Sequence, residues 1–113
     1  MSAITTHVLD ISRGRPAAGV PVLLERYTDG DWQTLGDGAT DADGRLRHLL
    51  PEDHDFGVGT YRLTFGTEAY FVSQGVEGFY PAVVVTFYVA DAGQHYHVPL
   101  LLSPFGYSTY RGS

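Results

Sequence analysis

Turn signals recur every eight to twelve residues along this chain, and the runs between them are rich in β-branched and aromatic residues. Each short run matches one strand, and each Gly, Pro or Asp cluster matches a reversal of the chain. Aromatic residues make up 13% of the chain, and such flat side chains pack well on a pleated surface. The pattern therefore predicts an all-β antiparallel sandwich of about eight strands. The predicted strands cover residues 4–11, 20–27, 32–40, 45–50, 60–65, 82–89, 95–103 and 106–110.

One segment departs from the strand pattern. Residues 68–75, EAYFVSQG, predict a short helix that Gly75 would end. No internal repeat or composition boundary divides the 113 residues, and a chain of this length buries roughly two thirds of its unfolded surface around one core. We therefore expect a single domain spanning residues 1–113.

Two hairpins are predicted from the turn chemistry. The first joins residues 20–27 to 32–40 across TDGD, where Gly30 can take a positive φ. The second joins residues 82–89 to 95–103 around ADAGQ. The strand at 82–89 is apolar on both faces, so it is either central in its sheet or covered by a second subunit. In so small a protein this favours oligomerisation through the last strands.

Composition excludes several classes of partner. A net charge of −6 and a pI near 5.1 argue against nucleic acid or an anionic membrane surface, since both need a basic footprint. The chain has no cysteine, which excludes disulfides and thiolate metal sites and fits a reducing compartment. The first residues carry neither a basic leader nor an apolar core, and the longest apolar run is too short to span a bilayer. We expect a cytoplasmic protein with no membrane or nucleic-acid partner.

Taken one at a time, the polar residues do not establish chemistry. Strand alternation places His95 and His97 on one face, where a His-x-His pair could bind zinc with a third ligand from elsewhere or could simply be exposed. His7 on the first strand could be merely packed, and Arg45 after a turn could be merely solvated. Asp41 and nearby acidic residues fit an Asx turn, and their spacing lacks the final Glu of a calcium loop.

Two longer stretches are more informative in combination. Residues 7–22, HVLDISRGRPAAGVPV, and residues 96–113, YHVPLLLSPFGYSTYRGS, resemble the N-terminal and C-terminal signatures of the transthyretin superfamily. Between them, TDADGR at 40–45 and FYP at 79–81 fall where that family has them. The resemblance covers essentially the whole chain. It departs at Ala82, where family members often carry a glutamate after FYP, and this position matches no catalytic residue.

The terminal Tyr-Arg-Gly-Ser separates two classes within the superfamily. The chain is similar to the 5-hydroxyisourate hydrolases, which open a ring amide of 5-hydroxyisourate with water to give 2-oxo-4-hydroxy-4-carboxy-5-ureidoimidazoline in urate breakdown. The resemblance implies a reaction without metal or cofactor. It also implies a homotetramer, a dimer of dimers, with active sites in a central channel, and it suggests that subunit contacts rather than the chain itself order the tail.

The resemblance also implies roles for particular residues. The positions that match the catalytic residues of the family are His7, Arg45, His97 and Ser113, whereas His95 is not a matched catalytic position. The residues expected to bind substrate or shape the site are His7, Arg45, Tyr110, Arg111 and Gly112.

These residue types suit amide hydrolysis, which needs a base for water and donors for the developing oxyanion. An imidazole titrates near neutrality, so His7 or His97 can act as the base, and the guanidinium of Arg45 offers a planar fork of donors. We favour His97 as the base, with Ser113 on its proton path and His7 against the ring, but the sequence leaves the choice of histidine open. The alternative function is a non-catalytic small-molecule carrier like the vertebrate hormone carriers, which lack the terminal motif and have other residues in place of His7 and His97.

Overall fold

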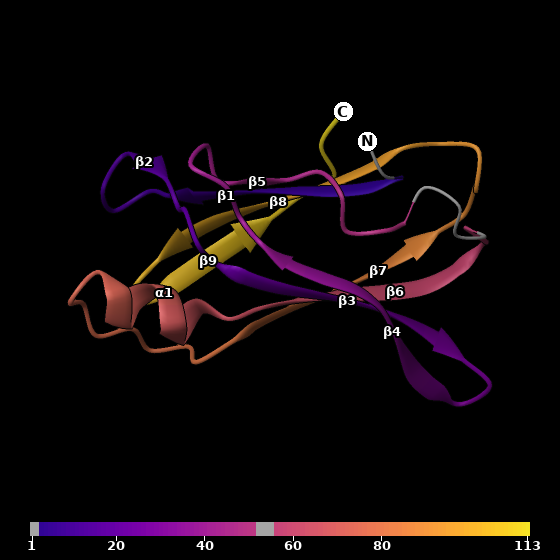
Figure 1. The fold of residues 1–113 in the computed structure, drawn as a ribbon, viewed down its shortest axis with the longest axis horizontal. Helices are drawn as coiled ribbons and strands as arrows, with labels where there is room; N and C mark the ends of the chain where they lie inside the picture. Colours follow the sequence, from indigo (N-terminus) through magenta and orange to yellow (C-terminus); the bar gives the residue numbers. More distant parts are fainter. Residues whose placement is uncertain (1–2, 52–55) are drawn as a thin grey trace.

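Two β-sheets packed face to face form the protein (Figure 1). The computed structural model describes residues 3–51 and 56–113. One sheet has the order β2-β1-β8-β9 with β5 paired to β1, and the other has the order β4-β3-β6-β7. The described residues form the elements β1 (Ile4–Asp10), β2 (Arg15–Pro16), β3 (Pro21–Thr28), β4 (Asp31–Ala39), β5 (Arg45–Leu46), β6 (Gly59–Phe65), α1 (Thr67–Ser73), β7 (Val83–Val89), β8 (Tyr96–Ser103) and β9 (Gly106–Thr109). The predicted β-sandwich with one short helix is confirmed.

Period-two alternation assigns the faces of each strand. In β1, Ile4, Thr6 and Val8 are buried between the sheets, while Thr5 and His7 point to the opposite face. Aliphatic and aromatic side chains from both sheets fill the space between them. The largest fully buried side chains are Tyr61, Phe65, Ile4, Leu24, Leu49, Leu63, Leu100, Leu102, Val8, Val20, Val83 and Val89.

The pairing of β1 with β8 differs from the antiparallel arrangement that we predicted. These strands run parallel over seven residue pairs, from Ile4 opposite Tyr96 to Asp10 opposite Leu102. The remaining strand pairs are antiparallel among the described residues. Because β1 and β8 come from opposite ends of the chain, their pairing brings the two signature stretches side by side.

The predicted hairpin around ADAGQ was wrong. Strand β7 pairs with β6 in one sheet, whereas β8 pairs with β1 and β9 in the other, so residues 90–95 cross between the sheets. Strand β7 is an edge strand, with Val84 50% and Tyr88 62% exposed. The predicted hairpin at TDGD is confirmed, since β3 and β4 pair across it and Gly30 has φ 80°.

Helix α1 closes one end of the sandwich between β6 and β7 (Figure 1). Gly75 follows its C-terminus with φ 68°, as predicted. The Tyr70 hydroxyl donates a 2.7 Å hydrogen bond to the buried Asp10 carboxylate, which ties the helix to β1. Burial, together with this bond, raises the pKa of Tyr70 to about 12. At seven residues α1 is too short to cross a membrane, and no longer apolar helix occurs in the described part of the chain.

Candidate active site

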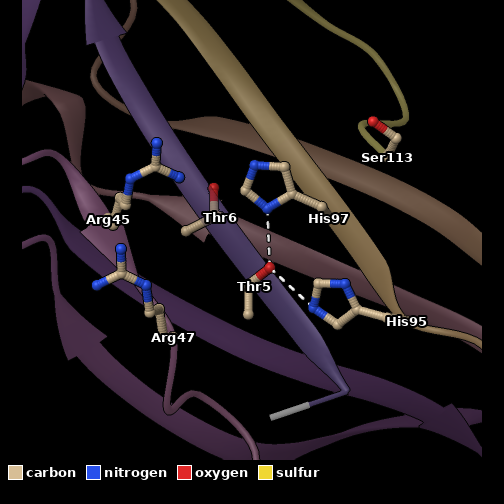
Figure 2. A pocket seen from close by; sticks show the side chains of 7 residues that line it. All are labelled: Thr5, Thr6, Arg45, Arg47, His95, His97 and Ser113. Atoms are coloured by element: carbon tan, nitrogen blue, oxygen red, sulfur yellow. Dashed lines mark hydrogen bonds between the residues drawn. The ribbon is translucent and has the colours of Figure 1, made fainter. Parts of the chain in front are cut away.

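A cavity of about 260 Å³ opens on the outer face of the sheet that contains β1 and β8 (Figure 2). Its described lining comes from β1, from β5 and the residues after it, from the start of β8, and from the end of the chain. The lining residues are Thr5, Thr6, Arg45, Arg47, His95, His97 and Ser113. Three of the four predicted catalytic residues, Arg45, His97 and Ser113, therefore share one cavity.

Strand register explains why these residues meet. The parallel pairing places Thr5 opposite His97, and the antiparallel pairing of β5 with β1 places Arg45 opposite His7. All four residues lie away from the hydrophobic core, on the side opposite Ile4 and its buried neighbours. In Figure 2 the two guanidinium groups lie on one side of β1 and the two imidazoles on the other.

The turn before β5 fixes the position of Arg45. The Asp41 carboxylate accepts backbone hydrogen bonds from Asp43 at 2.9 Å and from Arg45 at 3.0 Å, which confirms the predicted Asx turn. Gly44 has φ 76°, and its carbonyl accepts a 2.7 Å bond from the Val8 amide of β1. The turn is therefore bonded both within itself and to the strand that carries His7.

The Thr5 hydroxyl lies between two imidazoles. Its oxygen is 2.8 Å from Nδ1 of His97 and 3.1 Å from Nε2 of His95 (Figure 2). Burial lowers the pKa of His97, and the neighbouring basic groups His95, Arg45 and His7 lower it further. At neutral pH the His97 ring is therefore uncharged, the form that a general base requires.

His7 lies beside the cavity but is not among its described lining residues. Its Nε2 donates a 2.9 Å hydrogen bond to the Asp43 carbonyl, because a carbonyl oxygen can only accept. Burial and then the charge of Arg45 lower the pKa of His7, although the bond to Asp43 opposes this shift. Because Nε2 of His7 carries the hydrogen of this bond, His7 is less available than His97 for accepting a proton at Nε2.

The tail is held against β8 by contacts within the chain. The Gly112 amide donates a 2.8 Å hydrogen bond to the His97 carbonyl, and the Arg111 guanidinium lies 4.4 Å from the centre of the Tyr96 ring. A Cβ on Gly112 would lie 2.6 Å from Cδ2 of His97, so glycine permits this close approach. The chain itself therefore supplies contacts that hold the tail. The expectation that subunit contacts order the tail stays a prediction.

Not all the predicted substrate-binding residues meet in this cavity. Tyr110 and Arg111 line a second cavity of about 300 Å³, whose other lining residues come from β7, the start of β8 and the end of β9. Tyr110 is 55% exposed. Gly112 is the residue that bridges to His97, between this second cavity and Ser113. The tail thus passes from one cavity to the other.

Sequence reasoning missed Thr5, Thr6 and Arg47 as lining residues. Thr5 precedes His7 by two positions and Arg47 follows Arg45 by two, so strand alternation was a signal for both. His95 and His97 do share a face, as predicted, but among the described residues no group of three His, Cys, Asp or Glu could hold a metal ion. A zinc ion bound by His95 and His97 would therefore have no third ligand among the described residues.

The family model described as "HIUase/Transthyretin family" matches residues 4–112. The chain belongs to this family. Its relatives include a probable 5-hydroxyisourate hydrolase of Caenorhabditis elegans, 51% identical over 99% of this chain and 82% of the relative.

Solved structures similar to this chain include both a hydrolase and a thyroxine-bound transthyretin. The 5-hydroxyisourate hydrolase of Klebsiella pneumoniae is 40% identical over 97% of this chain and 98% of its own, with a TM-score of 0.82. Sea bream transthyretin in complex with thyroxine is 35% identical over 98% of this chain and 95% of its own, with a TM-score of 0.91. Because the backbone matches the transthyretin at least as well as the hydrolase, function within the family has to be argued from side chains.

Proposed function

We propose that this protein is a 5-hydroxyisourate hydrolase, which opens a ring amide of its substrate with water. The observation that carries the proposal is the cavity in which Arg45, His97 and Ser113 lie together, although they come from three separate parts of the chain. His7 lies beside it, paired with Arg45. The identity of the relatives adds support, because several hydrolases are nearly half identical to this chain over most of their length.

The cavity offers the two functions that amide hydrolysis needs. His97 is uncharged at neutral pH, so it can take a proton from water as the oxygen attacks the amide carbon. The carbonyl oxygen then gains negative charge, and the fixed positive charge of Arg45 on the other side of the cavity stabilises it. Ser113 lies on the proton path in this proposal, and His7 contacts the substrate ring.

The assembly belongs to the same proposal. Strands β7 and β9 are edge strands of their sheets, and both contribute residues to the lining of the second cavity. Exposed edges of this kind pair readily with another copy of the chain. The proposed assembly is a homotetramer, a dimer of dimers, in which Tyr110 and Arg111 help to close the site. The proposed location is the cytoplasm, which suits a chain without cysteine.

The competing function is a non-catalytic carrier, favoured by the high structural similarity to sea bream transthyretin. An absorbance assay separates the two functions. Freshly generated 5-hydroxyisourate decays spontaneously, and its near-UV signal should decay faster with this protein present. We expect His97→Ala to lose about 100-fold or more of the acceleration, since proton transfer by a placed base contributes about 10²–10⁴-fold.

His48→Ala is the matched control, because His48 is an exposed histidine outside the cavity lining. It should retain the full rate. An unchanged rate in His97→Ala would remove His97 as the base, and no acceleration by the folded wild-type protein would favour the carrier.

A further inference from the structure

The hydroxyl of Thr5 contacts both histidines that line the cavity. Its Oγ1 lies 2.8 Å from Nδ1 of His97 and 3.1 Å from Nε2 of His95, and the residue is only 4% exposed. Both distances fit hydrogen bonds. The two rings are nearly parallel, with an interplanar angle of 17° and centroids 6.4 Å apart, so both present a nitrogen edge to the hydroxyl (Figure 2).

The single proton of this hydroxyl couples the two rings. A threonine hydroxyl donates one hydrogen bond and accepts others, so with both rings neutral it donates to one ring and accepts from the other. If His97 donates from Nδ1, Thr5 donates to His95, and Nε2 of His97 is free to accept a proton. In Figure 2 this Nε2 lies on the side of the ring that faces the Arg45 guanidinium. In the opposite arrangement Nε2 of His97 carries hydrogen and cannot act as a base.

We propose that Thr5 and His95 form a proton relay behind His97. The inference rests on the proposed hydrolase function and adds to it a positioning residue, Thr5, and a terminal proton acceptor, His95. Thr5 holds His97 as the Nδ1–H tautomer before the reaction, which leaves Nε2 of His97 available to the attacking water.

Every proton that the relay takes up during the attack is returned before the reaction ends. As the water oxygen bonds to the amide carbon, its proton moves to Nε2 of His97, the Nδ1 proton moves to Thr5, and the hydroxyl proton of Thr5 moves to Nε2 of His95. The electron pair of the carbonyl bond moves to its oxygen, opposite Arg45. When the C–N bond breaks, the same path returns one proton to the leaving ring nitrogen, and all three residues recover their starting state.

The relay moves positive charge from the half-buried His97 to the exposed His95, where water stabilises it better. His97 is half-buried and faces His95 on its own side, His7 on β1 and Arg45 on β5, with Arg47 also lining the cavity. None of these groups favours an imidazolium at His97. His95 is exposed to solvent, so a charge there keeps more of its hydration. The hydrogen bonds of Thr5 therefore allow a proton to pass from His97 to His95.

The test combines Thr5→Val, Thr5→Ser and His95→Gln in the absorbance assay. Valine keeps the shape of threonine but lacks the hydroxyl, so we expect Thr5→Val to lower kcat about 10-fold or more with KM little changed. Thr5→Ser should restore most of kcat. His95→Gln should lower kcat in the wild-type background and have no further effect in Thr5→Val, because residues in one network are not additive.

The matched control is Thr67→Val, which removes a buried hydroxyl that donates to the Tyr80 carbonyl in a part of the fold away from the cavity. It should lose stability but keep kcat. A kcat within about twofold of wild type in Thr5→Val, or an equal effect of His95→Gln in both backgrounds, would overturn the relay. An inactive wild-type protein would instead overturn the proposed function.

A second measurement does not depend on activity or on how the variants fold. Nitrogen NMR of the wild-type protein near pH 8 reports the tautomer of each neutral histidine. The relay requires the Nδ1–H tautomer at both His97 and His95, since His95 accepts at Nε2. An Nε2–H tautomer at His97 would overturn the proposal whatever the kinetics.

Discussion

At the scale of single residues, the proposed hydrolysis requires that the His97 ring is uncharged and that its Nε2 carries no hydrogen. The half-buried ring pairs through Nδ1 with Thr5, and the titratable groups that act on it are basic. His7 differs, because its Nε2 is committed to the Asp43 carbonyl. Two histidines a short distance apart on adjacent strands thus have different atoms available for chemistry.

The pH dependence of activity follows from this difference. Because burial and neighbouring charges lower the pKa of His97, we expect the acid limb of kcat/KM to have its midpoint below 6.5, the ordinary imidazole value. A pH–rate profile of the wild-type protein measures it. In Arg45→Gln, which retains a polar side chain but no charge, the midpoint should move upward. A wild-type midpoint above 6.5 would contradict the assignment.

The same shift affects stability in a definite direction. The unfolded histidines bind protons near pH 6.5, whereas His7 and His97 in the fold bind them only at lower pH. Their contribution to the free energy of unfolding is therefore complete above 6.5 and is lost as the pH falls toward their folded-state pKa values.

Residue patterns predicted part of this site. The motifs predicted Arg45, His97 and Ser113 as catalytic residues, and all three line one cavity. Their catalytic roles stay a prediction. Thr5 and Arg47 were missed, although each lies two positions from a predicted residue on the same strand or its extension. A threonine in a strand is ordinary, so only the distances from its hydroxyl to two rings distinguish Thr5.

At the scale of elements, the turn at residues 41–45 connects the stability of β5 to the placement of Arg45. Gly44 has a positive φ, and a Cβ there would lie 2.4 Å from the Val8 carbonyl oxygen. Adding that carbon forces the turn away from β1 or distorts it. Either change moves the residue that follows, which is Arg45.

We therefore expect Gly44→Ala to lose both stability and activity. The left-handed backbone alone costs an L-residue about 1–2 kcal/mol, and the close contact with β1 adds to this cost. Gly14→Ala is the matched control, since Gly14 has φ 67° but its added Cβ would contact nothing within 4 Å. Denaturant unfolding and the absorbance assay should show a small loss of stability and full activity for Gly14→Ala. Equal behaviour of the two variants would contradict this role of the turn.

Local patterns predicted the elements better than their partners. The β3–β4 hairpin and the helix ending at Gly75 follow from short-range turn chemistry, and both are confirmed. The connection from β7 to β8 carries the same Asp and Gly signals as a hairpin, yet it crosses between sheets. The parallel pairing of β1 with β8 depends on core packing across about ninety residues of chain, which no local pattern encodes.

At the scale of the whole molecule, the proposed assembly places another copy against the open edge formed by β7 and β9. Val84 and Tyr88 expose apolar surface on β7, and Tyr107 is 41% exposed on β9. The second cavity is lined in part by both strands and includes Tyr110 and Arg111 of the tail. In the proposed assembly, a second copy at this edge would help to complete a site that includes Tyr110 and Arg111, which lie outside the first cavity.

We expect sedimentation analysis to give a mass of about 50 kDa, four times the 12.4 kDa chain, as the proposed tetramer requires. Tyr88→Lys should lower this mass, because a charge on an exposed edge strand opposes pairing with another copy. Val72→Lys is the control, since Val72 is 71% exposed on α1. A wild-type mass near that of one chain would contradict the assembly.

In the proposed function, the cavity formed by β1, β5, β8 and the tail hydrolyses 5-hydroxyisourate. The most direct test follows the near-UV decay of freshly generated 5-hydroxyisourate with the intact protein and with a variant that lacks residues 110–113, both checked for folding by circular dichroism. We expect the intact protein to accelerate the decay and the truncated variant, without Ser113 and the bridge to His97, to leave it unchanged. Equal rates in the two, or no acceleration by the folded intact protein, would contradict the proposed function.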